Sequence, residues 1–267
     1  MVKSKKKVNF TKMQGAGNDY IYINAMDTIP ENLPLLSRQI SDRHFGIGSD
    51  GLVAIMPSDT ADFRMRMFNA DGSEAEMCGN ASRCIGKYVY ERGLTEKCTI
   101  TLETLAGIKM LLLDVEDGVV NSVTVDMGEP EINIVDGLEF AVTAVSMGNP
   151  HAVIFCDEIT DDLVLCHGPK LESDPVFPNK SNIEFARIID RSHIQMRVWE
   201  RGTGETLACG TGACATLVAA VVNGLADRTA VVHLLGGDLE IRWDENTNHV
   251  YLKGGAEFVA DGNYYPL

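Results

Sequence analysis

Two cysteine-glycine pairs are the residues of this chain best suited to chemistry, one at Cys78 and one at Cys209. A glutamate lies four residues before each cysteine, at Glu74 and at Glu205, and small residues that can open a helix follow. A cysteine at the start of a helix lies beside unpaired backbone N–H groups and the positive end of the helix dipole. We expect this environment to stabilise the reactive thiolate form. The same N–H groups can bind a carboxylate.

Two such thiols fit one reaction class, the inversion of a carbon stereocentre. A base removes a proton from one face of the carbon, and an acid delivers a proton to the other face. Two cysteines suffice if one is ionised and one is not, and repulsion between two thiolates favours that mixed state. The alternative is that both are ordinary buried cysteines. Five further cysteines lack the paired context and are interpreted as core or incidental: Cys84, Cys98, Cys156, Cys166 and Cys214.

A weak internal repeat relates the two cysteines, whose positions differ by 131 (209 − 78). The repeat predicts two similar halves, which we expect to place one sulfur on each side of a shared ligand. At the same offset the chain matches Gly17-Asn18 with Gly148-Asn149, Met65-Arg66 with Met196-Arg197, Glu74 with Glu205, and Gly93-Leu94 with Gly224-Leu225.

The hydrophobic pattern around each cysteine predicts a strand, a polar turn, the Cys-Gly pair and then a helix. About 14 helix-compatible residues end at Gly93 or Gly224, where a left-handed helix cap is expected. The second helix is apolar all round and should be buried. Further strands are predicted at 19–24, 51–56, 61–68, 99–105, 108–115, 120–127, 151–156, 193–200, 231–235, 239–243 and 249–253.

These elements predict an α+β fold of two pseudo-symmetric domains, each a mixed, curved β-sheet around one central helix. The join is expected near residues 115–122. The first half is therefore assigned to residues 1–119, completed by residues 256–267, and the second half to residues 120–255.

Composition restricts the function classes. The 267 residues are 45% hydrophobic and 23% charged, which is typical of a soluble globular protein. The net charge of −15 argues against nucleic acid or an anionic membrane as partner, and the basic run at residues 3–7 is interpreted as a solvated tail. Without a membrane-length apolar run or a signal peptide, and with an odd number of cysteines, the chain is expected in the reducing cytoplasm.

Two sequence patterns suggest other sites but lack the context that those sites need. Residues 46–51, "GIGSDG", fit the dinucleotide-binding pattern, but no apolar strand precedes them and no helix follows. We interpret them as a turn. The cysteines contain no CxxC pair, so no metal site is predicted.

Five segments together resemble the diaminopimelate epimerase family: "QGAGNDY" (14–20), "FNADGSEAEMCGN" (68–80), "SMGNPHAV" (146–153), "WERGTGETLACGTGACA" (199–215) and "GGAEFVADG" (254–262). The resemblance implies a cofactor-independent epimerase that interconverts LL- and meso-2,6-diaminopimelate in lysine and peptidoglycan precursor biosynthesis. It also implies two domains with the active site in the cleft between them, and a homodimer.

The resemblance also assigns roles to individual residues. Cys78 and Cys209 become the catalytic acid/base pair, with His151 beside the thiols and Glu200 at the reacting amino group. Many family members have Gln where this chain has Gly51, so no role is carried onto that position. The implied substrate-binding residues are Asn18, Asn69, Asn149, Asn182, Glu200 and Arg201, with Gly79, Asn80, Gly210 and Thr211 offering backbone N–H groups to the reacting carboxylate.

Three other functions remain open on sequence grounds. A two-cysteine proline or hydroxyproline racemase would use the same chemistry, but the Asn residues and Arg201 favour a substrate with a second polar end. A thiol redox sensor would leave the Asn residues unexplained. A pyridoxal enzyme would need a Schiff-base lysine, and none lies in the strong motifs.

Overall fold

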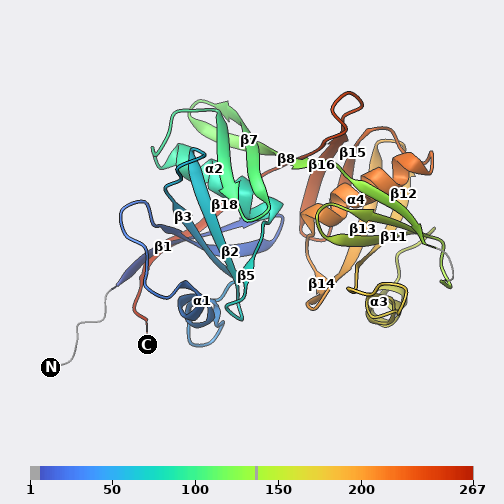
Figure 1. Ribbon diagram of the computed structural model, residues 1–267, viewed down its shortest axis with the longest axis horizontal. Coiled ribbons are helices and arrows are strands. Elements are labelled where there is room, and N and C mark those ends of the chain that lie inside the picture. Colours follow the sequence, from blue (N-terminus) through green and yellow to red (C-terminus); the bar gives the residue numbers. More distant parts are fainter. Residues whose placement is uncertain (1–6, 136–137, 267) are drawn as a thin grey trace. The chain divides into compact units, whose positions relative to one another are not determined.

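The computed structural model describes residues 7–135 and 138–266. It divides into two compact units (Figure 1). Unit 1 comprises Met1–Val125 together with Gly255–Leu267, and unit 2 comprises Asp126–Gly254. Apart from Lys7, the basic run that we interpreted as a solvated tail lies outside the described residues.

Unit 1 is a mixed sheet with two helices. Strands β2 and β3 pair in parallel, as do β4 and β6, while β1 pairs antiparallel with both β2 and β18. Helix α1 packs on β3 and β4 around a buried apolar cluster. Its elements are β1 (Val8–Gly15), β2 (Asn18–Asn24), α1 (Leu33–Ser41), β3 (Gly51–Met56), β4 (Phe63–Asn69), β5 (Glu74–Ala75), α2 (Gly79–Glu91), β6 (Thr99–Thr104), β7 (Gly107–Glu116), most of β8 (Val119–Gly128) and β18 (Glu257–Tyr264).

Unit 2 repeats this design. Strands β11 and β12 pair in parallel, as do β13 and β15, while β10 pairs antiparallel with β11 and β12 with β13. Its elements are β9 (Glu131–Val135), β10 (Val142–Ser146), β11 (Pro150–Phe155), η1 (Asp162–His167), α3 (Gly168–Glu172), β12 (Asn182–Asp190), β13 (His193–Glu200), β14 (Gly204–Thr206), α4 (Gly210–Val222), β15 (Thr229–Leu234), β16 (Gly237–Trp243) and β17 (Val250–Gly254).

The strand register of the two units follows the sequence repeat. In unit 1 Tyr20 pairs with Gly51 across the parallel strands β2 and β3. In unit 2 His151 pairs with Asn182 across β11 and β12, and both positions are shifted by 131 (151 − 20 and 182 − 51). The weak sequence similarity therefore corresponds to a backbone repeat without a gap in this region.

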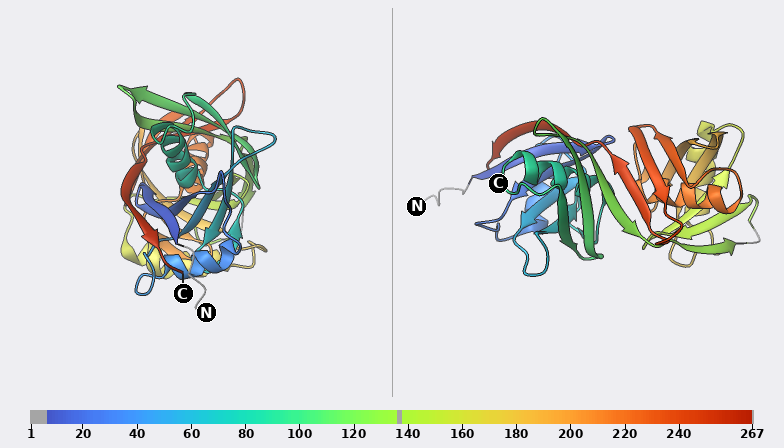
Figure 2. Two further views of the ribbon diagram at one scale, coloured as in Figure 1. Left: turned by 90° about the vertical axis from the view of Figure 1, so that its left-hand side faces the viewer. Right: turned by 90° about the horizontal axis from the view of Figure 1, so that it is seen from above.

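Each unit contains one buried principal helix that begins directly after its cysteine (Figures 1 and 2). Helix α4 packs against β10, β11, β12, β13, β15, β16 and β17, which explains why all its faces are apolar. Gly93 and Gly224 follow the helices with φ of 69° and 71°, so both helices end in the predicted left-handed cap. The prediction of an α+β fold with a central helix in each half is confirmed.

The boundary between the units differs from the sequence assignment. It falls between Val125 and Asp126, inside strand β8, rather than at residue 119. Asp117 and Gly118, with φ of 52° and 80°, form the hairpin turn between β7 and β8. A turn and a linker share the same polar, glycine-containing signal, so sequence alone placed the join at the hairpin.

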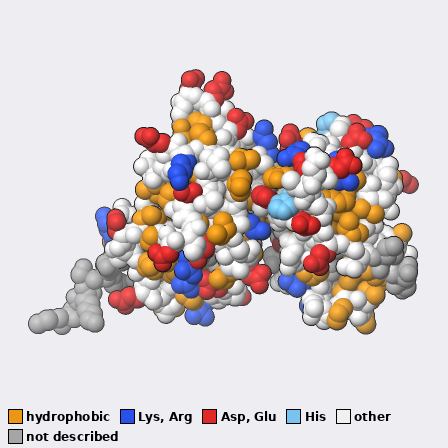
Figure 3. Space-filling view, turned by 45° about the horizontal axis from the view of Figure 1, so that its top comes forward, with side chains coloured by type: hydrophobic (Ala, Val, Ile, Leu, Met, Phe, Trp, Pro, Cys, Tyr) orange, Lys and Arg blue, Asp and Glu red, His pale blue; other side chains and the backbone are white. Residues whose placement is uncertain are grey.

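The segment that fits the dinucleotide pattern is a turn. Residues 46–50 form no helix, and β3 follows directly, as predicted. In the part of the chain that the structure describes, no helix is long and apolar enough to cross a membrane. Figure 3 shows acidic side chains scattered over one face of each unit, with Lys and Arg side chains among them.

Candidate active site

Cys78 is the N-cap residue of α2 in unit 1. Its backbone is extended (φ −140°, ψ 125°) and its side chain is half-buried. The sulfur does not cap its own helix; instead the thiol S–H donates to Asn18 Oδ1 at 3.5 Å. The thiol therefore has an acceptor on the neighbouring strand β2.

A chain of polar side chains holds this acceptor in place. Asn18 Nδ2 donates to Asp50 Oδ2 at 2.8 Å, and Asn80 Nδ2 donates to Asn18 Oδ1 at 3.4 Å. Arg83 Nη1 in turn donates to Asn80 Oδ1 at 2.9 Å. Arg83 is fully buried, and its Nε donates to the carbonyl of Gly255. These hydrogen-bonded side chains thus connect the buried guanidinium of Arg83 to the carboxylate of Asp50.

Cys209 occupies the matching position at the start of α4, but its surroundings differ. The residue is buried, and its sulfur accepts from the Gly212 N–H at 3.4 Å and lies 3.5 Å from Thr211 Oγ1. Burial, followed by the charges of Glu200 and Glu184, raises the pKa of Cys209 well above its usual value, while the contacts with Thr211 and Gly212 lower it. The helix start alone therefore does not make this cysteine acidic, contrary to our expectation.

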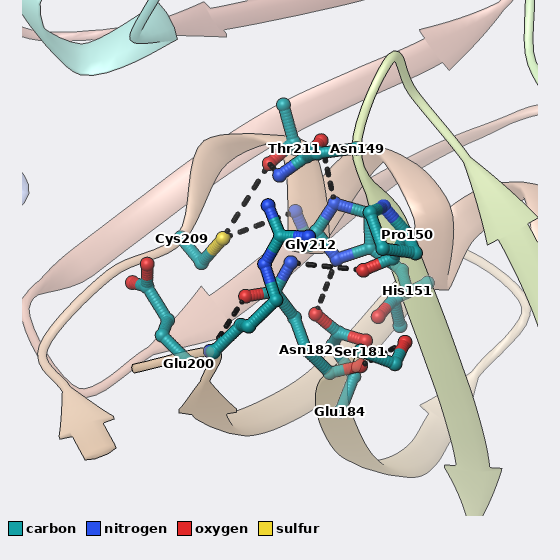
Figure 4. A network of polar contacts seen from close by, with 12 residues as sticks. Asn149, Pro150, His151, Ser181, Asn182, Glu184, Glu200, Cys209, Thr211 and Gly212 are labelled. Atoms are coloured by element: carbon teal, nitrogen blue, oxygen red, sulfur yellow. Dashed lines mark hydrogen bonds and ion pairs between the residues drawn. The ribbon is translucent and has the colours of Figure 1, made fainter. Parts of the chain in front are cut away.

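His151 connects this cysteine to a buried carboxylate (Figure 4). Its Nδ1 lies 2.6 Å from Glu184 Oε1, and its Nε2 lies 3.0 Å from Asn149 Oδ1. Asn149 Nδ2 then donates to Thr211 Oγ1 at 3.3 Å. His151 and Glu184 are fully buried, and Glu184 Oε2 has no hydrogen-bond partner among the described residues.

Three of these groups could also face a metal ion. Ligand atoms of His151, Glu184 and Cys209 all lie within 4.8 Å of one another. The contact between His151 and Glu184 is already at hydrogen-bond distance, so an ion would have to replace that bond.

A second part of unit 2 carries Asn182 and Arg201, predicted to bind the substrate, and Glu200, predicted to lie at its reacting amino group. Asn182 Oδ1 accepts from the Arg201 N–H at 2.9 Å, and its Nδ2 donates to the carbonyl of Pro150. Arg201 is exposed, and its guanidinium donates to the carbonyl of Asn179. Glu200 lies at the end of β13, where Thr206 Oγ1 donates to its carboxylate at 2.5 Å.

The remaining predicted residues lie at strand ends and helix starts. Asn69 ends β4, is exposed, and donates to Ser73 Oγ at 3.0 Å. Gly79 and Gly210 are the first residues of α2 and α4, where backbone N–H groups have no partner within the helix. Unit 1 thus holds Asn18, Asn69, Cys78, Gly79 and Asn80, and unit 2 holds Asn149, His151, Asn182, Glu200, Arg201, Cys209, Gly210 and Thr211.

The packing around Gly51 explains why this chain has glycine where many family members have Gln. A Cβ at this position would lie 2.0 Å from the carbonyl oxygen of Phe68 and 2.8 Å from Tyr20 Cε1. No side chain fits without a shift of the backbone. The packing against Phe68 of the neighbouring strand β4 requires glycine at this position, so the chain cannot carry the Gln side chain of many family members here.

Sequence reasoning missed three charged residues that organise the two cysteines: Asp50, Arg83 and Glu184. Glu184 lies between Ile183 and Phe185 in the buried first half of β12, and Arg83 lies on a buried helix. A charge between apolar neighbours was the available signal for Glu184. Asp50 gave no such signal, because it lies in the turn that resembles a dinucleotide-binding loop.

Comparison with known proteins identifies a family. The family profile described as diaminopimelate epimerase matches residues 10–133 and 143–259. A diaminopimelate epimerase of Acetivibrio thermocellus is 57% identical over 96% of this chain and 98% of its own length. One from Methanococcus maripaludis is 53% identical, over 96% of this chain and 99% of its own length.

Solved structures with low sequence identity share the fold. A phenazine biosynthesis protein of the PhzF family from Bacillus anthracis superposes with a TM-score of 0.77 at 19% identity, covering 97% of this chain and 99% of its own. A hydroxyproline epimerase from Agrobacterium vitis, with bound trans-4-hydroxy-L-proline, gives a TM-score of 0.74 at 15% identity, covering 97% and 93%. At these identities the match concerns the fold alone.

Proposed function

Because this chain belongs to the diaminopimelate epimerase family, we propose that it interconverts LL- and meso-2,6-diaminopimelate without a cofactor, as a step in lysine and peptidoglycan precursor biosynthesis. One observation carries the mechanism. Each unit places a cysteine directly before its buried helix, at matched positions of the repeat. A reaction that needs one acid and one base of the same kind accounts for this duplication.

The proposed reaction is a proton exchange at the α-carbon. The thiolate of one cysteine removes the α-proton and becomes a thiol, and the thiol of the other delivers a proton to the opposite face and becomes a thiolate. The C–H bond broken on one face is replaced by a C–H bond on the other, so no redox partner is required. Cys78 and Cys209 exchange roles in the reverse direction.

We assign the reacting carboxylate to the helix starts. Backbone N–H groups of Gly79, Asn80, Gly210 and Thr211 would bind it, and the two helix dipoles would stabilise the charge that develops as the proton leaves. Glu200 would accept a hydrogen bond from the reacting ammonium group. In support, Glu200 is among the charged groups that act on Cys209.

The non-reacting end of the substrate would contact the amide side chains and Arg201. A guanidinium can bind a carboxylate with two parallel hydrogen bonds, and an amide can both donate and accept. The exposed Arg201 is backed by Asn182, which holds its backbone N–H. The proposed residues are Asn18, Asn69, Asn149, Asn182 and Arg201.

Isotope exchange tests this function directly. The purified protein is incubated with LL-diaminopimelate in deuterated water, with a reductant and without added cofactor. We expect meso-diaminopimelate that carries deuterium at the inverted α-carbon. A meso product without α-deuterium would exclude proton transfer, and no product would exclude the epimerase activity.

The alternative reading, a proline or hydroxyproline racemase, differs in its substrate. Proline has no second amino-acid end, so it would leave Arg201 without a carboxylate to bind. Turnover of L-proline measured beside turnover of LL-diaminopimelate separates the two. Preference for proline would overturn our substrate assignment but not the two-cysteine chemistry.

We further propose that the protein is a cytoplasmic homodimer. The seven cysteines, all within the described residues, form no disulfide, which suits a reducing compartment. The dimer rests on membership in the family. Sedimentation equilibrium of the purified protein should give twice the chain mass, and a monomer at all concentrations would contradict it.

A further inference from the structure

The two cysteines have hydrogen-bond surroundings of opposite polarity: Cys78 faces an acceptor, and Cys209 faces donors. We propose that Asp50 and Arg83 in unit 1 and Glu184 in unit 2 are positioning residues that present an acceptor to Cys78 and a donor to Cys209. These contacts favour the thiol form of Cys78, as the acid, and the thiolate form of Cys209, as the base. This inference rests on the proposed function for its catalytic meaning, although the polarity can be tested without substrate.

In unit 1, a charged group at each end of the row of hydrogen-bonded side chains determines which atom of each amide faces its neighbour. An ionised carboxylate can only accept, so Asp50 requires Nδ2 of Asn18 to face it, and Asn18 Oδ1 must point away. A guanidinium can only donate, so Arg83 requires Oδ1 of Asn80 to face it. Asn80 Nδ2 must then face Asn18 Oδ1, as observed. Two charged groups thus independently require an acceptor oxygen at Cys78.

The polarity in unit 2 depends on one proton. With the observed contacts, His151 Nε2 faces Asn149 Oδ1 and must donate, while Nδ1 faces Glu184. The pair therefore holds one proton more than a neutral imidazole beside a carboxylate, and its net charge is zero. A neutral pair suits full burial, because an unpaired buried charge is costly.

This proton determines what Cys209 contacts. With His151 donating, Asn149 Nδ2 faces Thr211, whose oxygen accepts and whose O–H is free to donate to the Cys209 sulfur. The Gly212 N–H donates to the same sulfur, so two donors favour the thiolate against the effect of burial. If the pair loses its proton, Nε2 must accept, the amide of Asn149 reverses, and Thr211 O–H turns away from the sulfur.

The repeat makes this difference specific to each unit. It matches His151 with Tyr20 and Glu184 with Val53 (151 − 20 and 184 − 53), and these two side chains cannot form such a pair. It matches Asp50 with Ser181 (181 − 50). The two scaffolds correspond, while the groups that orient Asn18 and Asn149 come from non-equivalent positions.

Other titratable groups face both cysteines. Around Cys209 these are Glu200 of β13, Glu184 of β12 and His151 of β11. Around Cys78 they include Tyr22 of β2 and Cys84 of α2. Burial raises the pKa of Tyr22 well above 10 and that of Cys84 to about 11, so both stay neutral near pH 7.

The test replaces each orienting carboxylate with its amide. The wild type, Glu184→Gln and Asp50→Asn are alkylated with iodoacetamide from pH 6 to 10, and modification of the Cys78 and Cys209 peptides is followed separately by mass spectrometry. We expect Asp50→Asn to lower the apparent pKa of Cys78 by about one unit. Glu184→Gln removes both the orienting contact and a charge that raises the pKa of Cys209, so its effect on Cys209 is compared with that of Thr211 variants, which keep this charge. The cysteine of the other unit is the internal control.

A second pair of variants tests the last link in unit 2. Thr211→Val removes the hydroxyl, keeps the Glu184 charge and should raise the apparent pKa of Cys209 by about one unit, whereas Thr211→Ser keeps the hydroxyl and should keep the wild-type apparent pKa of Cys209. The pKa change that Glu184→Gln causes at Cys209 should differ between the wild type and the Thr211→Val background, because only the wild type has a hydroxyl for Glu184 to orient. The pH profile of kcat/KM provides the same comparison independently of alkylation.

The outcomes distinguish this inference from the proposed function. An apparent pKa of Cys209 that Thr211→Val does not raise, or an apparent pKa of Cys78 that Asp50→Asn does not lower, would overturn the assigned polarity even if deuterium exchange proceeds. Opposite shifts in a protein that fails to exchange deuterium would support the polarity and remove its catalytic meaning. In ¹⁵N spectra, His151 should carry protons on both nitrogens or on Nε2 alone in the wild type. A proton on Nδ1 alone would also overturn the assigned polarity.

Discussion

Unit 1 and unit 2 share one backbone plan but surround their cysteines differently. Tyr20 with Gly51 and His151 with Asn182 occupy the same register, and both cysteines precede a buried helix. Cys78 is half-buried and donates to an amide oxygen, whereas Cys209 is buried and accepts from Gly212. The backbone repeat places two sulfurs, and side chains outside the repeat give each one its own environment.

The comparison also explains a pair of residues inside the helices. The repeat matches Gly212 with Ala81 (212 − 81), which is fully buried. A Cβ at Gly212 would lie 2.7 Å from Glu184 Oε1, whereas the counterpart of Glu184 in unit 1 is Val53. The buried carboxylate in unit 2 therefore requires glycine where unit 1 accepts alanine.

The largest expected effect comes from removing either sulfur. Cys78→Ala and Cys209→Ala should each lower kcat for epimerisation by about 10²–10⁴-fold, because each turnover uses one cysteine as acid and the other as base. The rate of meso-diaminopimelate formation measures this loss. Cys98→Ala, at an exposed cysteine, is the control and should remain active. Near-normal activity of either single variant would mean that the two units do not both contribute.

The second-largest expected effect is a loss of stability when glycine and alanine are exchanged between positions 212 and 81. Gly212→Ala should destabilise unit 2 by about 1–3 kcal/mol, because the new methyl group meets Glu184 Oε1 at 2.7 Å. The reciprocal Ala81→Gly should cost unit 1 only about 0.5–1 kcal/mol, the ordinary cost of glycine in a helix. Hydrogen exchange of α2 and α4 under native conditions measures each unit separately. Equal losses would remove this difference between the helices.

The third-largest expected effect concerns the loop that follows β13 in unit 2. Glu172 accepts from Trp199 Nε1, from the Gly202 N–H and from Lys180, all at 3.0 Å, which fixes the loop that carries Arg201. Burial tends to raise the pKa of Glu172, but these hydrogen bonds outweigh it and lower the pKa below its usual 4.5. Glu172→Gln should cost about 1–3 kcal/mol at neutral pH.

The pH dependence of this loss has a definite sign. A lowered carboxyl pKa stabilises the folded state above the unfolded value of about 4.5, and this stability disappears as the pH falls through the folded pKa. The gap between wild type and Glu172→Gln should therefore narrow as urea unfolding is repeated at lower pH. A gap that is constant with pH would show that Glu172 acts only through packing.

The smallest effects concern two matched ion pairs. Arg66 and Arg197 are equivalent in the repeat, and each Nε is 2.7 Å from the carboxylate of Glu74 or Glu205. Arg197 is more buried and also contacts Asp161. We expect Arg66→Ala to cost about 0.5 kcal/mol and Arg197→Ala about 1 kcal/mol. Amide exchange of β5 and β14 measures both, and a larger loss at Arg66 would contradict this order.

Much of the fold could be predicted from the sequence because its signals are local and periodic. Alternation in residues 63–68 and 194–198 predicted β4 and β13, and the glycines after α2 and α4 predicted where those helices end. The constant offset between matched positions related the two halves on sequence grounds alone. The domain boundary was misplaced because the turn at Asp117 and Gly118 has the composition of a linker.

The site was predictable only in part, because motifs name residues but not their partners. Cys78, Cys209 and the Asn residues stand out by position and repetition. The contact between Asn18 and Asp50 depends on the pairing of β2 with β3, and the atom of each amide that faces its partner depends on charges elsewhere in the fold. Neither can be obtained from spacing along the chain.

The pairing of β18 with β1 has a consequence for synthesis. Strand β18 (Glu257–Tyr264) follows unit 2 in the chain, so unit 1 closes only after all of unit 2 has been synthesised. Unit 2 is one continuous stretch, Asp126–Gly254, and all its strands are available earlier. We infer that unit 2 can fold during translation, while one edge of β1 stays open until β18 has emerged from the ribosome. A stalled chain that lacks Gly255–Leu267 would expose that edge and be prone to aggregation.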